Sequence, residues 1–296
     1  MADLLSVVVR RRGVVEARHR VHAVATQGGH VVAVAGDPSF VCFLRSSAKP
    51  LQALPLARAR EDLDDRDLAI ASASHLADDD QIAAVRALLA KAPATEEELE
   101  CGLEQGRSPE GLYHNCSGKH AGMLALCRAR GWESRGYRRA EHPLQRLLLA
   151  EIAAAARLPA EVIPTAVDGC GVVTFAMPLE RMAAMFSRFH ELDGAPRVAA
   201  AMQAHPDLIR GPAAADSRLM RTLPGWIAKG GAEGLLCAAG PDGTGVALKV
   251  EDGSGRAVGP ALAAFLGALG HPVDELATTP VENSRGERVG EVVIDR

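Results

Sequence analysis

The chain has 296 residues and a formal net charge of −4, with 48% hydrophobic and 24% charged residues. These values are ordinary for a soluble globular protein, and they give no reason to expect nucleic acid or an anionic membrane as a partner. No apolar run approaches the roughly 18 residues of a membrane-spanning helix, and the first residues lack the basic start and apolar core of a signal peptide. We therefore expect one cytoplasmic domain covering residues 1–296.

Hydrophobic patterning predicts short strands near both ends of the chain and helices between them. The strands are expected at 6–10, 21–25, 30–35, 40–44, 162–167, 235–238, 245–250 and 288–295. The helices are expected at 48–60, 79–91, 95–104, within 115–130, and at 143–157, 175–189, 195–204, 216–222 and 259–269. Pro50 fits the first turn of its helix, whereas Pro55 predicts a kink.

The order of these elements favours one fold class. Strands and helices do not alternate regularly, so a doubly wound parallel sheet is not expected. We predict an α+β fold in which strands from both ends of the chain share one mostly antiparallel sheet. The sheet lobe would take residues 1–45 and 225–296, and the helical lobe would take residues 46–224.

Lysine is rare in this chain, because only five of the 33 basic residues are lysines. Arginine supplies nearly all the surface cations, and arginine cannot lose its proton in a protein. A lysine that persists in such a chain is a candidate for chemistry that needs a neutral amine. This reasoning selects Lys49, Lys119 and Lys229.

The stretch Arg45-Ser46-Ser47-Ala48-Lys49-Pro50 carries a hydroxyl and an amine three residues apart. On a helix these positions share one face, so Ser46 and Lys49 can meet. A serine becomes a nucleophile when a neighbouring base takes its proton, and a lysine can be that base if burial or another cation keeps it neutral. The alternative is an N-cap serine followed by a solvated lysine.

Lys229-Gly230-Gly231 resembles the K-[TS]-G strand of serine β-lactamases, penicillin-binding proteins and serine-dependent glutaminases. Glycine there lets a substrate approach the backbone, and a second lysine near Lys49 would depress the pKa of either amine. The alternative is a simple turn. Because buried polar groups need partners, we expect this stretch to cluster with 45–49, 73–75, 115–120 and 168–171.

Two cysteines and a lysine form a possible metal site. Cys116 and Lys119 are three residues apart, and Cys170 lies in a glycine-rich turn. Two thiols with an amine or imidazole are plausible zinc ligands, although lysine is a rare one. The competing interpretation is a thiol nucleophile at Cys116 with His120 as its base.

Several motifs together resemble the asparaginase II family of the Rhizobium etli type, in family order and over nearly the whole chain. They are RSSAKPLQALP (45–55), ASASH (71–75), HNCSGKHAGMLALC (114–127), DGCGVVTFAMPL (168–179), HPDLIRG (205–211), KGGAEGL (229–235) and GVALKVEDGSGRA (245–257). The resemblance implies a fold similar to serine β-lactamases and glutaminases. It also implies hydrolysis of L-asparagine to L-aspartate and ammonia.

The resemblance assigns roles residue by residue. It implies the catalytic pairs Ser46–Lys49 and Ser74–Lys229, with Ser46 as the nucleophile. It implies that substrate is bound by Arg45, Asn115, His120 and Asp168. It also implies a zinc ion on Cys116, Lys119 and Cys170, which the Ser–Lys chemistry does not require, and a homodimer.

The sequence departs from the family pattern after His75. The family continues there with Ser, then Gly or Ser, then Glu, whereas this chain has Leu76-Ala77-Asp78. The departure bears on substrate contacts, so two alternatives stay open. One is a related amidohydrolase that acts on glutamine or another amide, and the other is a non-catalytic protein that binds a small molecule or zinc.

Overall fold

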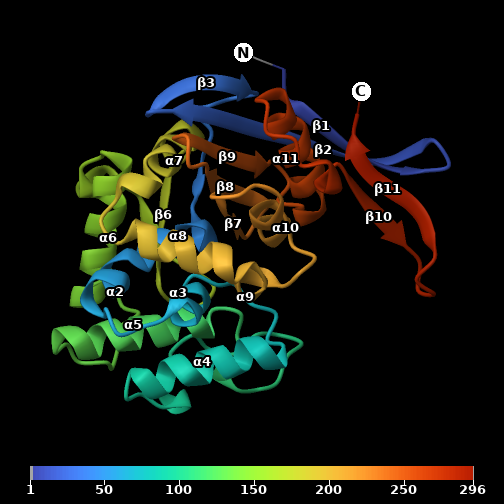
Figure 1. Cartoon of the computed structure of the whole chain (residues 1–296). Coiled ribbons are helices and arrows are strands. Elements are labelled where there is room, and N and C mark those ends of the chain that lie inside the picture. Colours follow the sequence, from blue (N-terminus) through green and yellow to red (C-terminus); the bar gives the residue numbers. More distant parts are fainter. Residues whose placement is uncertain (1–2, 296) are drawn as a thin grey trace.

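The computed structural model describes residues 3–295 (Figure 1). The strands are β1 (Leu5–Arg11), β2 (Val14–Gln27), β3 (His30–Ala35), β4 (Val41–Phe43), β5 (Thr165–Val167), β6 (Val173–Pro178), β7 (Ile227–Gly231), β8 (Leu235–Ala239), β9 (Thr244–Val250), β10 (Thr278–Glu282) and β11 (Arg288–Ile294). The helices are α1 (Lys49–Gln52), α2 (Leu54–Ala59), α3 (Asp65–Ala71), α4 (Asp79–Lys91), α5 (Ser117–Arg130), α6 (Pro143–Ala156), α7 (Leu179–Ser187), α8 (Ala195–Ala204), α9 (Pro206–Arg210), α10 (Ala215–Thr222) and α11 (Val258–Ala268). The 3₁₀ helices η1 (Arg45–Ala48) and η6 (Gly255–Ala257) precede α1 and α11.

Strands from the two ends of the chain form one antiparallel sheet. Its order is β10-β11-β1-β2-β9-β8-β7, and β3 also pairs with β2. Strand β1 lies between β2 and β11, which brings the two termini to the same side of the molecule (Figure 1). This arrangement, with a helical middle region below the sheet, confirms the α+β class that the sequence predicts.

The centre of the sheet is covered on both faces. In β2, the consecutive residues Ala23, Val24 and Ala25 are all fully buried, although their side chains point alternately to opposite faces. Helices α7 and α11 both pack against this sheet. Helix α7 belongs to the segment that the sequence assigned to the helical lobe, so the sheet lobe also takes residues from the middle of the chain.

The predicted helix at 175–189 is wrong at its start. Residues Val173–Pro178 form β6, the middle strand of a small antiparallel sheet in the order β4-β6-β5. Val173, Thr174 and Phe175 favour a strand, and Met177 precedes a proline, which disfavours helical backbone at that residue. The helix therefore begins only at Leu179, one residue after Pro178.

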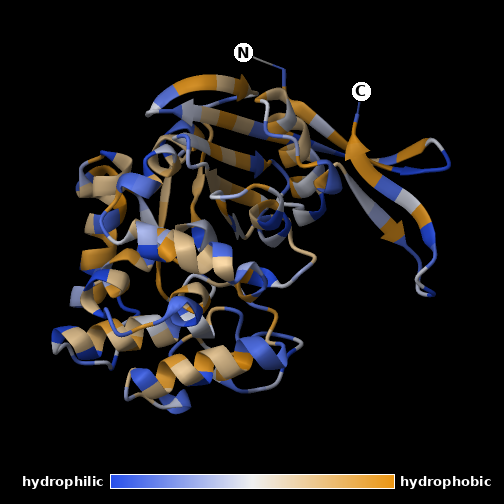
Figure 2. Cartoon of the chain, in the orientation of Figure 1, coloured by the Kyte–Doolittle hydropathy of each residue, from blue (hydrophilic) through white to orange (hydrophobic). Residues whose placement is uncertain are grey.

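Several helices of the helical half, such as α4, have one hydrophobic and one hydrophilic side (Figure 2). The kink predicted at Pro55 is confirmed, since α1 ends at Gln52 and α2 begins at Leu54. The helix predicted at 95–104 is wrong, because only a single 3₁₀ turn forms there, at Glu96–Glu98. Among residues 3–295, none of the helices has the length and apolar character that a membrane span requires.

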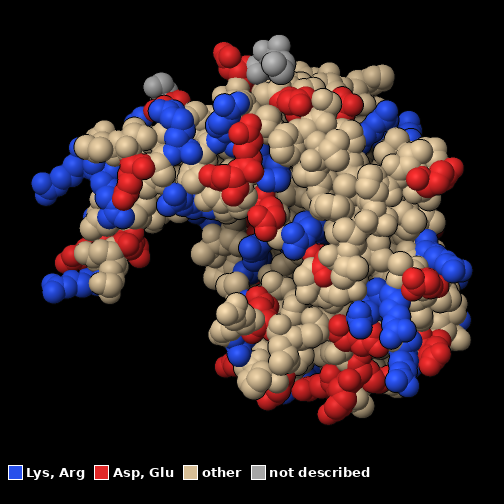
Figure 3. All heavy atoms as spheres, turned by 180° about the vertical axis from the view of Figure 1, so that it is seen from behind, with Lys and Arg blue, Asp and Glu red and all other residues tan. Residues whose placement is uncertain are grey.

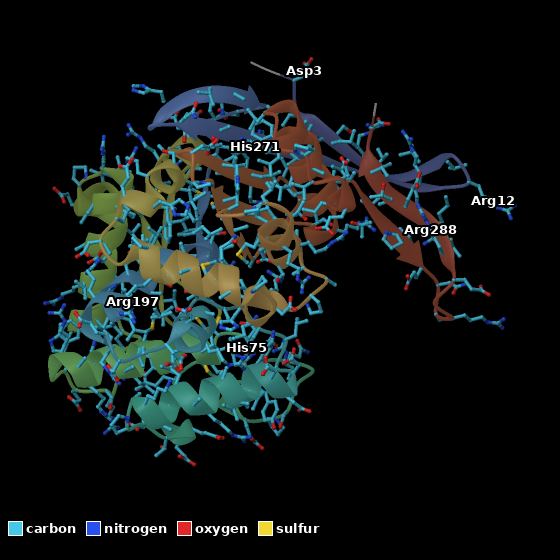
Figure 4. The ribbon with its side chains drawn as sticks, in the orientation of Figure 1. Asp3, Arg12, His75, Arg197, His271 and Arg288 are labelled. Atoms are coloured by element: carbon cyan, nitrogen blue, oxygen red, sulfur yellow. The ribbon has the colours of Figure 1, made fainter. Side chains whose placement is uncertain are left out.

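Two hairpins extend beyond the body of the molecule and form an arm. One joins β1 to β2 and the other joins β10 to β11, and Arg12 and Arg288 lie toward its outer end (Figure 4). The sequence did not predict β10, and β2 is longer than the expected 21–25. These residues have few buried neighbours, so the hydrophobic pattern that marks a core strand is weak there.

Glycine at 245 allows α7 to lie directly on β9. A Cβ at this position would lie 2.1 Å from Ala183 O and 2.2 Å from Ser187 N, both of which are backbone atoms of α7. Gly245→Ala is therefore expected to lower the free energy of unfolding by about 1–3 kcal/mol or more. Thermal or urea unfolding measures this effect.

Gly267→Ala in α11 is the matched control, because nothing lies within 4 Å of its added Cβ. Alanine is the better helix former, so this variant should be neutral or more stable by up to about 1 kcal/mol. Equal stability of the two variants would contradict the close packing of α7 on β9.

Candidate active site

The predicted nucleophile lies in η1, directly after a backbone position that L residues rarely adopt. Arg45 has φ 47, in the left-handed region. Two hydrogen bonds hold this turn, from Leu44 N to Phe175 O at 2.8 Å and from Arg45 N to Thr174 Oγ1 at 3.1 Å. A strained residue of this kind persists only where its surroundings fix it. The turn places Ser46, which is half-buried, at the start of the helical segment that contains Lys49.

Lys49 is buried and is bonded to a residue of a different segment. Its Nζ donates to Ala73 O and, at 2.9 Å, to Ser74 Oγ. Within residues 3–295 no hydrogen bond joins Lys49 to the Ser46 hydroxyl. Burial is the main cause that lowers the pKa of Lys49; the charge of Cys116 opposes it, and Lys119 lowers the pKa further.

Ser74 lies in the loop that follows α3, and neighbouring backbone groups fix that loop. Ser74 N donates to Ile209 O at 2.8 Å, and His75 N donates to Asn115 O at 3.1 Å. Helix α5 can approach the end of α3, from which this loop leaves, because Gly118 has no side chain, and a Cβ there would lie 2.3 Å from Ile70 O. The loop thereby holds Ser74 against Lys49, and the Ser74–Lys229 pair expected from the resemblance is not hydrogen-bonded in the described part of the chain.

Lys229 is fully buried on β7. Its Nζ donates to Gly230 O at 2.7 Å and lies 3.8 Å from Asp216 Oδ2. Burial lowers the pKa of Lys229 to about 7; Asp216 opposes the shift, and the charges of Lys49 and Arg210 add to it. A substantial fraction of this amine is therefore neutral near pH 7, as an amine that accepts a proton must be.

A hydroxyl from η1 joins the serine segment to the second lysine segment. Ser47 Oγ donates to Lys229 O at 2.8 Å, so η1 lies against β7. Gly231 lets the two approach, because a Cβ there would lie 3.0 Å from both Leu44 O and Ser47 Oγ. The structure thus brings residues 45–49, 73–74 and 229–231 together, although long stretches of sequence separate them.

The two thiols and Lys119 lie close to one another and to Lys49, whose pKa they influence. Lys119 Nζ donates to Cys170 Sγ at 2.9 Å. A hydrogen bond from Cys170 lowers the pKa of the Cys116 thiol well below its ordinary value, against the effect of burial. Burial alone would lower the pKa of Lys119, but the charges of Cys170 and Cys116 outweigh it and raise that pKa.

These donors fit zinc in their chemistry. Zinc binds deprotonated sulfur and nitrogen ligands, so Cys116, Cys170 and Lys119 supply suitable donor atoms, and Lys119, whose pKa is raised, would have to lose its proton to bind the metal. No group of three or more His, Cys, Asp or Glu side chains in the described residues is placed to hold a metal ion. A zinc ion would therefore need Lys119 as a ligand in addition to Cys116 and Cys170.

The residues expected to bind substrate lie in different surroundings. Arg45 Nε donates to Asp168 Oδ1 at 2.6 Å, so these two side chains form an ion pair beside the serine. His120 is fully buried; burial first, and then Lys119, lower its pKa well below the ordinary value. Its Nδ1 bonds Tyr137 Oη at 2.6 Å, and its Nε2 is buried with no partner among residues 3–295.

Asn115 is hydrogen-bonded to Glu104. Its N donates to Glu104 Oε2 at 2.5 Å, and its Nδ2 lies 3.3 Å from Glu104 Oε1. His75 lies nearby, between the α3 loop and α5, and its Nε2 bonds Ser117 Oγ at 2.8 Å (Figure 4). Burial is the main cause that lowers the pKa of His75 to about 3, so this ring is neutral.

Sequence reasoning missed two residues that complete the cluster, Ser47 and Asp216. Ser47 was overlooked because Ser46 has the spacing to Lys49. Asp216 contacts Lys229 and Gly230 from α10, but its sequence surroundings show only a helix start. Neither residue has a local signal that would have revealed its contact.

Serine hydroxyls near buried amines are an arrangement that an enzyme transferring an acyl group from an amide or ester can use. The family model for L-asparaginase II matches residues 7–294. The chain therefore belongs to the L-asparaginase II family and is an amidohydrolase, as the sequence predicted, and not a non-catalytic binding protein.

Comparison with solved structures finds distant similarities. EstCE1, a hydrolase with promiscuous acyltransferase activity, is 12% identical over 80% of this chain and 90% of its own, with a TM-score of 0.42. A beta-lactamase from Mycobacterium bovis is 14% identical over 85% of this chain and 95% of its own, with a TM-score of 0.38. Simvastatin synthase from Aspergillus terreus is 12% identical over 78% of this chain and 86% of its own, with a TM-score of 0.33. No curated protein matches the chain.

Proposed function

We propose that this amidohydrolase hydrolyses L-asparagine to L-aspartate and ammonia through an acyl-enzyme on Ser46. Family membership supports the reaction type. The observation that carries the mechanism is the buried hydrogen bond from Lys49 to Ser74, next to the segment that contains Ser46. Lys229, with its pKa lowered to about 7, lies on the adjoining strand and supplies a second amine for proton transfer.

In the proposed first step, Ser46 Oγ bonds to the side-chain amide carbon of asparagine. The hydroxyl proton passes to neutral Lys49 and then to the departing nitrogen, which leaves as ammonia when the C–N bond breaks. In the second step, water adds to the acyl carbon, the bond between that carbon and Ser46 Oγ breaks, and one proton of the water returns to Ser46 Oγ, which releases aspartate. Ser74, bonded to Lys49, and Lys229 relay these protons.

Arg45 and Asp168 are proposed to position the substrate. Asp168 holds Arg45 Nε, which leaves other guanidinium N–H groups to bind the substrate carboxylate. His120 can take part only as a neutral ring, because its low pKa excludes a charged ring at neutral pH. Glu104 holds the Asn115 side chain through one Nδ2–H, which leaves Oδ1 and the second Nδ2–H as the groups proposed to face substrate.

If zinc is bound, Cys116, Lys119 and Cys170 would hold it, and it would supply a fixed positive charge that orients the substrate. Metal analysis of the purified protein tests for zinc at one ion per chain. The homodimer implied by the family resemblance also stays a prediction, which the molecular mass in solution tests.

Ammonia release from L-asparagine and L-glutamine tests the proposed substrate. We expect a clear preference for asparagine, with and without added zinc. Preference for glutamine would place this chain among related amidohydrolases with another substrate. The Leu76-Ala77-Asp78 segment, which departs from the family pattern, would then be the first candidate for the cause of that preference. Absence of ammonia from both substrates would contradict the proposal.

The pH dependence of the reaction should follow the protonation of the Lys229 amine. Its folded-state pKa, about 7, lies below its ordinary value, so the amine gains a proton as the pH falls through 7. We expect kcat/KM to rise with pH through this range, because only the neutral amine accepts a proton. The same shift predicts that folding stability increases from about pH 7 upward, where the unfolded chain still binds this proton.

Lys229→Met is the comparison for this profile. It removes the titrating amine but keeps an unbranched, apolar side chain in the buried position. The step near pH 7 should disappear together with most of the activity. An unchanged pH profile in the residual activity would contradict the assignment of this step to Lys229.

A further inference from the structure

A cavity lies beside the lysine strand β7 and shares Asp216, Gly230 and Gly231 with the cluster described above. It is a cavity of about 290 Å³ between β7, α9–α10 and η6. Its polar lining includes Arg210, Asp216, Arg218 and Arg256, together with the backbone of Gly230 and Gly231. Ser46, Lys49, Ser74 and the thiols are not part of this lining. Figure 3 shows that the molecule is hollowed between the arm and the helical body, with basic and acidic side chains around this region.

The charges around this cavity do not balance. Three guanidinium groups line it against one carboxylate. That carboxylate, of Asp216, is already engaged, because its Oδ2 accepts from Gly230 N at 2.9 Å and lies 3.8 Å from Lys229 Nζ. The cavity wall therefore carries positive charge that its own acidic residue does not neutralise.

Arg210 is the cation without a partner. Arg256 Nε donates to His19 Nε2 at 3.0 Å, and Arg218 is bonded to Glu275. By contrast, Arg210 makes no side-chain hydrogen bond or ion pair with any residue in 3–295, although it is only half exposed. A partly buried guanidinium keeps five N–H donors that need acceptors, and these donors match a planar or tetrahedral oxyanion.

The backbone of β7 has a glycine, Gly230, where the guanidinium of Arg210 lies close to the strand. A Cβ on Gly230 would lie 3.3 Å from an Arg210 terminal nitrogen and 3.2 Å from Asp216 Oδ2. Glycine at 230 thus leaves room for Arg210 to lie close to the strand. This contact gives Gly230 a role distinct from that of Gly231, which lies against η1.

We propose that this cavity binds a small oxyanion, a carboxylate or a phosphate, with Arg210 as its anchor. Arg256 adds positive charge at the wall, whereas the charge of Arg218 is already paired with Glu275. An anion bound there would lie next to Gly230 and close to Lys229. Its negative charge would therefore change the electrostatic environment of the Lys229 amine. The inference rests on the cavity and its charges and does not depend on the substrate proposed above.

Calorimetric titration at low salt tests the site, with inorganic phosphate and succinate as separate probes. At least one should bind saturably, and the pair shows whether phosphate or carboxylate is preferred. Arg210→Gln should weaken that binding by roughly ten-fold or more, the usual effect of losing hydrogen bonds to a charged group. Arg288→Gln, in an exposed arginine on the arm, should leave it unchanged.

A second variant tests the site independently, in case Arg210→Gln does not fold. Ala213 is exposed and lines the cavity, so Ala213→Glu adds a negative charge without disturbing the core. It should weaken binding of the same anion. Saturable binding that survives both Arg210→Gln and Ala213→Glu, or no binding of either probe, would overturn the proposal.

Discussion

Ser46→Ala is expected to lower kcat for ammonia release from L-asparagine by roughly a thousand-fold or more, as removal of a catalytic nucleophile does. The alanine side chain cannot form the acyl-enzyme, and no other hydroxyl has the same position at the start of the helical segment. Fold and substrate binding should persist, because Ser46 is only half-buried. Steady-state kinetics measures the first effect, and calorimetric binding of asparagine measures the second.

Ser47→Ala is the matched control in the adjacent position. Its hydroxyl is bonded to Lys229 O, and losing one such hydrogen bond typically costs about 1 kcal/mol. We expect stability to fall slightly and activity to fall by no more than about ten-fold, since 1.4 kcal/mol corresponds to that factor. If Ser47→Ala abolished turnover and Ser46→Ala kept it, the assigned nucleophile would be wrong.

Lys49→Met is expected to lower kcat by about 10²–10⁴-fold, the range for removal of a general base. Methionine fills the volume of the buried lysine stem but cannot accept a proton or bond Ser74 Oγ. KM should change much less than kcat, because Lys49 is proposed to act on the proton and not on the substrate carboxylate. Kinetics over a range of asparagine concentrations separates the two.

Lys49→Arg distinguishes lost basicity from lost charge. Arginine keeps the positive charge and the hydrogen-bond donors but stays protonated at all accessible pH values. The proposal therefore predicts that arginine does not restore activity, provided that circular dichroism shows the variant is folded. Recovery of most activity by arginine would indicate that position 49 supplies charge and not a base.

The candidate catalytic and metal-binding residues could be selected from the sequence because they stand out locally. Ser46 and Lys49 have a helical spacing, Lys229 precedes two glycines, and Cys116 and Cys170 lie in motifs rich in polar residues. Their partners could not be assigned in the same way. The sequence spacing suggested that Lys49 contacts Ser46, whereas in the structure Lys49 bonds Ser74, which is 25 positions away.

The sequence by itself determined the α+β class, the strand-forming ends, the helical middle and the set of unusual lysines, because these depend on local pattern and composition. The tertiary structure alone decided which hydroxyl meets which amine, and that Asp216 and Ser47 contact Lys229. It also placed Arg210 against Gly230, in the lining of the cavity that has more arginines than acidic residues. Contacts of this kind depend on how strands and helices pack across long sequence separations, and on burial, which shifts the pKa of each lysine only after the chain has folded.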